Sequence, residues 1–68
     1  MDVKVYDIDD KVYMLMDELD NDGIHYVLLS NQDDEDDILF RKIDGNELVP
    51  LDNEEEVVKV LQLFDEAN

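Results

Sequence analysis

The amino-acid sequence predicts an α+β domain: a small antiparallel sheet of about four strands, with one C-terminal helix packed on one face. Short segments rich in β-branched and aromatic residues alternate with turns that contain Asp, Asn and Gly, which is typical of hairpins. The one unambiguous helical pattern lies near the C-terminus. The chain has 68 residues, of which 44% are hydrophobic, so we expect one domain, residues 1–68, with a thin core.

The first two strands are predicted at residues 3–8 and 11–18, with a turn at Asp9-Asp10 between them. The apolar residues of segment 3–8 alternate moderately, as in a strand. Segment 11–18 has two interpretations, because its apolar residues alternate but also fall on one helical stripe. Periodicity alone leaves strand and helix open for this segment.

The central strands are predicted at residues 24–29 and 38–43. The first of them follows Asp20-Asn21-Asp22-Gly23, whose residues tolerate a positive φ and therefore indicate a tight turn. Between the two strands, residues 30–37 are predicted to form a polar loop that contains five consecutive acidic residues. A second tight turn, Asp44-Gly45-Asn46, ends the later strand.

The last strand and the helix are predicted at residues 47–50 and 54–65. Pro50 lacks a backbone N–H, so this short strand belongs at an edge or an exit of the sheet. Asp52 or Asn53 is expected to cap the helix, and a Glu three residues later completes a capping box. The apolar stripe that faces the sheet consists of Val57, Val60, Leu61 and Phe64.

The charge is large for so small a domain. The chain has 21 Asp and Glu residues against five Lys and Arg, a net charge of −16, whereas a magnitude of about 2 to 8 is comfortable. We expect no direct binding to DNA or RNA, because Lys and Arg are needed to neutralise phosphates. The charge points instead to a partner with a basic protein surface; the other interpretation is a solvated acidic surface without a partner.

Three acidic clusters are the candidate partner-binding residues. With an expected diameter of about 28 Å, the net charge of −16 amounts to about one charge per 1.75 Å, close to the value of about 1.7 Å for duplex DNA. A nucleic-acid mimic that inhibits a DNA- or RNA-binding protein is therefore an alternative, provided that the clusters share one face. The clusters comprise Asp17, Glu18, Asp20 and Asp22; Asp33, Asp34, Glu35, Asp36 and Asp37; and Glu54, Glu55 and Glu56.

Metal binding and catalysis have weaker support. Glu18-x-Asp20-x-Asp22-Gly23 resembles the start of an EF-hand loop, but position 12 would be Leu29 instead of Glu. Weak divalent-cation binding through acidic loops stays an alternative.

The chain has no Cys and one His, and His25 and Ser30 would face opposite sides of one strand. A chain this short has little room for a pocket of several hundred cubic ångströms, so we expect no enzyme activity, no catalytic residue, no cofactor and no specific metal site.

Much of the chain resembles a known family. Residues 26–29 give a strand with a Tyr and aliphatics, 40–41 an aromatic-Arg pair, 44–45 an Asp-Gly turn, 47–51 the pattern Glu-Leu-x-Pro-aliphatic, and 52–64 a helix with an acidic start. This layout resembles the DUF1292 (UPF0473) family of small acidic bacterial proteins. The family's function is uncharacterised, so the resemblance implies no catalytic residue and no ligand. It implies a hairpin that leads into the Tyr26 strand, which favours a strand at residues 11–19.

The sequence also carries expectations about location and assembly. Residues 1–10 include four aspartates, and the longest apolar run, residues 12–16, is far shorter than a membrane span. We therefore expect a cytoplasmic protein without membrane association. An exposed sheet edge favours pairing of two copies whereas the acids oppose it, so a monomer or a weak dimer is expected.

Overall fold

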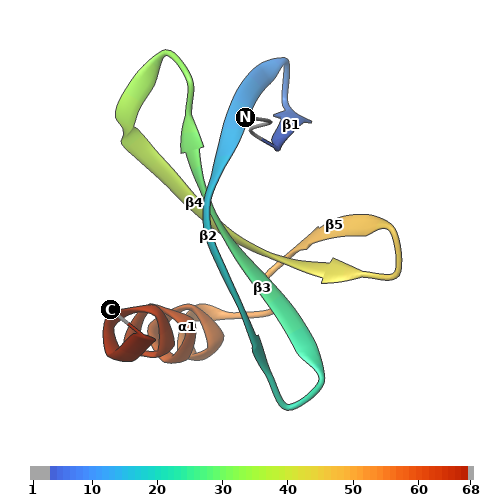
Figure 1. Cartoon of the computed structure of the whole chain (residues 1–68), viewed down its shortest axis with the longest axis vertical. Coiled ribbons are helices and arrows are strands. Elements are labelled where there is room, and N and C mark those ends of the chain that lie inside the picture. Colours follow the sequence, from blue (N-terminus) through green and yellow to red (C-terminus); the bar gives the residue numbers. More distant parts are fainter. Residues whose placement is uncertain (1–3, 68) are drawn as a thin grey trace.

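The computed structural model describes residues 4–67 and has an α+β architecture. Five strands form one antiparallel sheet in the order β1-β2-β3-β4-β5, so each strand pairs with its neighbour in the sequence (Figure 1). A single helix follows the last strand. The elements are β1 (Val5–Ile8), β2 (Lys11–Asn21), β3 (Ile24–Asn31), β4 (Asp34–Asp44), β5 (Glu47–Pro50) and α1 (Glu54–Ala67).

The predicted fold class is confirmed, but the sheet has five strands instead of about four. Both short end segments pair along their whole length: β1 with the start of β2, and β5 with the end of β4. Strand β5 is an edge strand that ends on Pro50, opposite Arg41, which agrees with the missing N–H of proline. Residue 3, the start of the predicted first strand, lies outside the described residues.

The ambiguous segment 11–18 is a strand, and it continues to Asn21. Pairing on both sides settles the ambiguity, because β2 lies between β1 and β3. The register slips between Leu15 and Asp17, which makes Met16 the extra residue of a β-bulge. This bulge breaks the strict alternation of the apolar residues, so the sequence pattern also fits a helix.

The prediction of a polar loop at residues 30–37 is wrong. Strand β3 continues to Asn31 and β4 begins at Asp34, so only Gln32 and Asp33 form the turn. The backbone N–H of Asp33 donates to Oδ1 of Asn31 over 2.8 Å, which supports the turn. Four of the five consecutive acidic residues therefore lie in a strand. Asp34 pairs with Asn31 of β3, and the register then shifts before Ile38 pairs with Ser30.

The predicted turns are confirmed by their backbone geometry. Asp22 and Gly23 have φ angles of 51° and 79°, and Gly45 has 64°. Asp9 and Asp10 also have positive φ angles, of 50° and 66°. Two consecutive residues with positive φ match the right-handed twist of a hairpin, as in a type I′ turn, so short loops hold the long strands in register.

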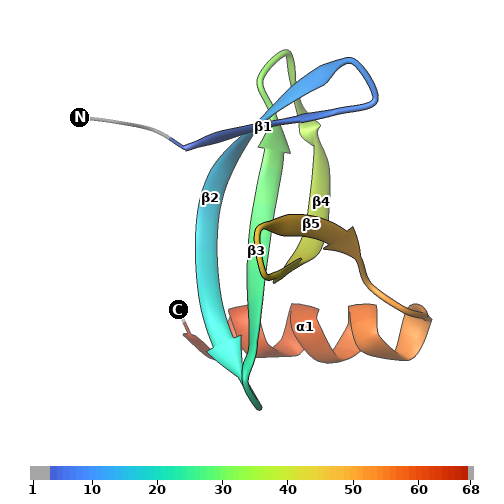
Figure 2. The same ribbon diagram turned by 90° about the vertical axis from the view of Figure 1, so that its right-hand side faces the viewer.

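The curled sheet has two apolar faces, each with its own core cluster. On the outer face, which carries α1, Tyr26 packs with Val60 and Phe64 of the helix. On the inner face, toward which β1 and β5 curl, Val27 and Leu29 are buried with a third residue, Tyr13 of β2. Figure 2 shows α1 behind the sheet, running across the strands near the β2–β3 turn, with β1 and β5 in front.

The helix begins with the predicted cap. The N–H of Glu56 donates to Oδ1 of Asn53 over 2.9 Å, and Oε1 of Glu56 accepts the N–H of Asp52 over 2.6 Å. Val60 and Phe64 are 0% and 4% exposed, and the Phe64 ring lies 5.7 Å from that of Phe40. The helix ends at Ala67, two residues after the predicted end. The domain as a whole measures 29 × 27 × 25 Å.

Candidate functional site

The acidic side chains lie mostly on the surface. Twenty of them belong to residues 4–67, and seventeen of these twenty are exposed. The three that are not exposed are Asp17, Asp37 and Glu56, each half-buried. The domain is nearly as wide as it is long, so the charge surrounds a compact body instead of following a rod.

The structure does not gather the three acidic clusters at one place. Asp33–Asp37 lies at the β3–β4 hairpin, whereas Asp20 and Asp22 lie at the β2–β3 hairpin, and the eight residues of β3 separate the two turns (Figure 1). A strand of that length spans about 26 Å. The helix start is nearer to the β2–β3 end, because Lys59 of α1 lies 3.9 Å from Asp22.

One member of the Asp33–Asp37 cluster has a structural role. The hydroxyl of Tyr13 donates to Oδ2 of Asp37 over 2.6 Å, and the amide of Asn31 donates to the same oxygen over 3.1 Å. The hydrogen bond from Tyr13, and then that from Asn31, lower the pKa of Asp37. The carboxylate in turn raises the pKa of Tyr13. Asp37 thus ties three strands together, and the other four members of its cluster are exposed.

Glu56 has a similar structural role at the helix start. Its carboxylate accepts from Nζ of Lys42 at 3.2 Å and from the hydroxyl of Tyr26 at 3.3 Å, besides the N–H of Asp52. The hydrogen bond from the Asp52 N–H is the main cause that lowers the pKa of Glu56, and Lys42 adds to it. Burial disfavours the charged form of Lys42, but its hydrogen bonds to Asp52 and Glu56 outweigh this and raise its pKa.

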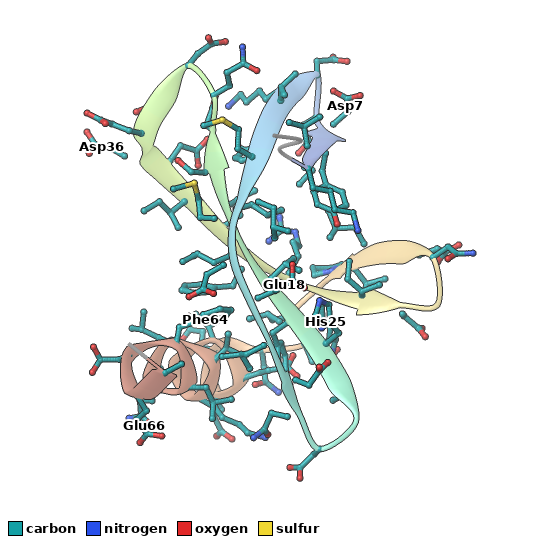
Figure 3. All side chains as sticks on the ribbon, viewed as in Figure 1. Asp7, Glu18, His25, Asp36, Phe64 and Glu66 are labelled. Carbon is teal, nitrogen blue, oxygen red and sulfur yellow. The ribbon has the colours of Figure 1, made fainter. Side chains whose placement is uncertain are left out.

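Glu18 and Asp20 are brought together around the single histidine. Nδ1 of His25 lies 2.8 Å from Oδ1 of Asp20, and Nε2 lies 3.4 Å from Oε1 of Glu18. The register places all three on the inner face, and Figure 3 shows Glu18 and His25 on the side of β5, opposite Phe64. Both ring nitrogens of His25 thus contact carboxylates of the neighbouring strand.

An open hollow of about 310 Å³ lies on the inner face beside this histidine. It is lined by His25, Glu18, Tyr6, Lys4 and Leu48, among others. The expectation of little pocket space was therefore too strict, although the hollow is at the lower limit for ligand sites, about 300 Å³. It combines one lysine, one histidine and one carboxylate with apolar walls, and it holds no hydroxyl or thiol nucleophile other than the Tyr6 phenol.

The remaining chemical hypotheses gain no support from the geometry. Ser30 lies on the outer face and is buried, whereas His25 lies on the inner face, so these two residues do not approach each other. Within residues 4–67, no group of three or more His, Asp or Glu side chains is placed to hold a metal ion. No helix in that range is long and apolar enough to cross a membrane.

An exposed apolar surface lies on the outer face, and the sequence pattern did not predict it. Met16, Leu61 and Ile38 are 59%, 54% and 52% exposed. Leu61 belongs to the stripe predicted to face the sheet, but that stripe is wider than the sheet contact of α1. The β-bulge at Met16 and the register of Ile38 have no local sequence signal, so this surface follows from the structure alone.

Comparison with known proteins adds no relative. No protein-family model matches the chain, and neither the curated proteins nor the solved structures that were compared gave a significant match. The function is therefore inferred from the chain's own geometry and charge.

Proposed function

We propose that this domain is a non-enzymatic acidic module that binds a basic surface of a protein partner. The observation that carries the proposal is the exposure of seventeen of the twenty described acidic side chains on a folded body with a net charge of −16. Such a field attracts a basic protein over about a Debye length and accelerates the encounter. Within the proposal, the domain acts in the cytoplasm as a monomer or weak dimer and is related to the DUF1292 family.

The positions of Asp37 and Glu56 support the view that the acidic residues have two different roles. These two carboxylates hold strands and helix together, so they stabilise the fold. Their exposed neighbours, such as Asp36 and Glu55, remain available to Lys and Arg side chains of a partner. We propose that binding depends on the exposed set and that folding depends on the two structural carboxylates.

The test is affinity capture from the native host on the immobilised domain at low salt, with elution by rising NaCl. The expected result is retention of one or a few basic proteins that elute as salt increases, because contacts between surface charges are screened. A variant with Asp33→Asn, Asp34→Asn, Glu35→Gln and Asp36→Asn should retain less of them. The proposal fails if the retained proteins are not basic, or if salt does not release them.

The same capture separates the proposed function from nucleic-acid mimicry. A partner that binds DNA or RNA is mixed with its nucleic acid in the presence of the domain. Competition between the domain and the nucleic acid would favour a mimic. If the complex still binds nucleic acid normally, mimicry is rejected and the basic-surface proposal is retained.

A further inference from the structure

We infer that the outer face of the sheet carries a docking surface for a basic amphipathic protein segment, beside α1. This inference rests on the proposed function and specifies the partner's chemistry. The surface, here called the apolar patch, combines apolar residues from one row of the sheet, the bulge residue Met16 and one flank of the helix. Its residues are Val5, Met14, Met16, Ile38, Val57 and Leu61.

The register defines the sheet part of the apolar patch. Val5 pairs with Met14, Met14 with Ser30, and Ser30 with Ile38, so the four residues form one row across four strands. The next row toward α1 contains Leu28 and Phe40, which pack against the helix. Rows on one face of a sheet are roughly 7 Å apart, so the Ile38 row lies directly beyond the part that α1 covers.

The helix part follows from the contacts on the opposite flank. Glu56 binds Lys42, and Lys59 lies near Asp22, so that flank faces the β2–β3 turn. Val57 and Leu61 are each about 160° from Lys59 around the helix axis. They therefore lie on the flank that faces the Ile38 row, and they are 39% and 54% exposed.

Most of the large hydrophobic residues that are exposed in residues 4–67 belong to this surface. The six large hydrophobic residues that are exposed in residues 4–67 are the five exposed members of the apolar patch and Val58. Met16 protrudes because it is the extra residue of the β-bulge. A contiguous exposed apolar surface that is rimmed by polar residues is typical of an interaction site.

The charge around the apolar patch determines which kind of partner fits it. The rim is acidic: the alternation of β1 places Asp7 beside Val5, Asp36 lies two residues before Ile38 on β4, Asp17 follows Met16 on β2, and the helix adds Glu54 and Asp65. All five Lys and Arg residues of the chain are described, and each lies either on the inner face or on the flank of Lys42 and Lys59. A partner must therefore supply apolar side chains flanked by Lys or Arg.

The same charges argue against a second copy as the occupant. Each copy has a net charge of −16, and self-association would place one acidic rim against another, which is unfavourable. A basic amphipathic segment satisfies both parts of the surface, because its apolar side chains cover the apolar patch while its Lys and Arg reach the rim.

The test uses two labelled synthetic peptides of Leu and Lys with identical composition, one patterned as an amphipathic helix and one scrambled. Binding to the full-length domain is measured by fluorescence anisotropy at moderate salt. The amphipathic peptide should bind about tenfold more tightly than the scrambled one. Leu61→Gln and Ile38→Thr should each weaken its binding roughly tenfold, as expected for losing half of a large side chain's burial.

Val58→Gln is the matched control. Val58 is 53% exposed but lies about 160° from Val60, toward the outer surface of the helix and at the border of the apolar patch, so this variant should weaken binding much less than Leu61→Gln does. Far-UV circular dichroism verifies that all three variants are folded. The inference is overturned, and the proposed function survives, if the two peptides bind equally and the variants have no effect. Both are overturned if neither peptide binds.

Discussion

Glu56 and Glu55 are adjacent in the first turn of α1, yet the structure predicts that their replacement by Ala has very different consequences. Both changes remove one negative charge near the helix N-terminus, and both have the same effect on helix propensity. Glu55 is exposed, whereas the Glu56 side chain is only 15% exposed and accepts hydrogen bonds from Lys42, Tyr26 and the Asp52 N–H. The difference between the two variants therefore isolates these hydrogen bonds.

The magnitude follows from the hydrogen bonds that an Ala side chain at position 56 cannot accept. A hydrogen bond to a charged group contributes about 1.5–3 kcal/mol, and Lys42 keeps a second partner because Asp52 lies 3.2 Å from its Nζ. We therefore expect Glu56→Ala to lower the free energy of unfolding by about 2 kcal/mol relative to Glu55→Ala, a drop in Tm of roughly 10 °C for a domain of this size.

The assay is thermal unfolding followed by far-UV circular dichroism, with both variants in the same buffer. Glu55→Ala should stay within about 0.5 kcal/mol of the natural chain, as is usual for surface positions. Equal melting temperatures for the two variants would refute the assignment of Glu56 as a structural carboxylate, and with it the separation of structural from partner-facing acids.

The charges and hydrogen bonds lead to three further predictions. The stability that Glu56 contributes is present above its ordinary pKa of 4.5 and lost as pH falls through its lowered folded pKa, so the difference between Glu56→Ala and Glu55→Ala should shrink in acid; a constant difference would contradict the lowered pKa. The hydrogen bond to Asp37 raises the pKa of Tyr13 above 10.0, and burial does the same for Tyr26. Ultraviolet titration should therefore show tyrosine ionisation that is delayed until the domain unfolds. Tyr13→Phe should reduce that delayed component, and a delayed component of unchanged size would count against the Asp37 contact. Adding NaCl should raise Tm because it screens the repulsion within a net charge of −16, whereas a Tm that falls with salt would show that attractive ion pairs dominate.

The sequence allowed much of the fold to be predicted, because turns and caps are local. Gly23 and Gly45 adopt positive φ, and Asn53 caps α1 as expected. The stretch Asp34–Asp37 could not be predicted as a strand, since five consecutive acids are typical of a loop. Asp34 pairs with Asn31 of β3, and the hydroxyl of Tyr13, 24 residues away, donates to Asp37. A long-range contact of this kind has no local signal.

The candidate site was less predictable than the fold. The acidic residues were evident from composition, but Glu56 and Asp37 could not be distinguished from their neighbours without the positions of Lys42 and Tyr13. The apolar run at residues 12–16 gave no local sign of which of its members would be buried. The β-bulge separates its members, because Tyr13 is 4% exposed and Met16 is 59% exposed.

The measurement that tests the central claim most directly is backbone amide chemical-shift mapping by NMR, with the basic amphipathic peptide added to the isotope-labelled domain. We predict the largest shifts around Met16, Ile38 and Leu61, on the outer face beside α1, with smaller shifts at the acidic rim. Shifts centred on His25 and Leu48 of the inner face would contradict the docking surface. Shifts spread evenly over all exposed acids would show that charge alone, without the apolar patch, governs binding.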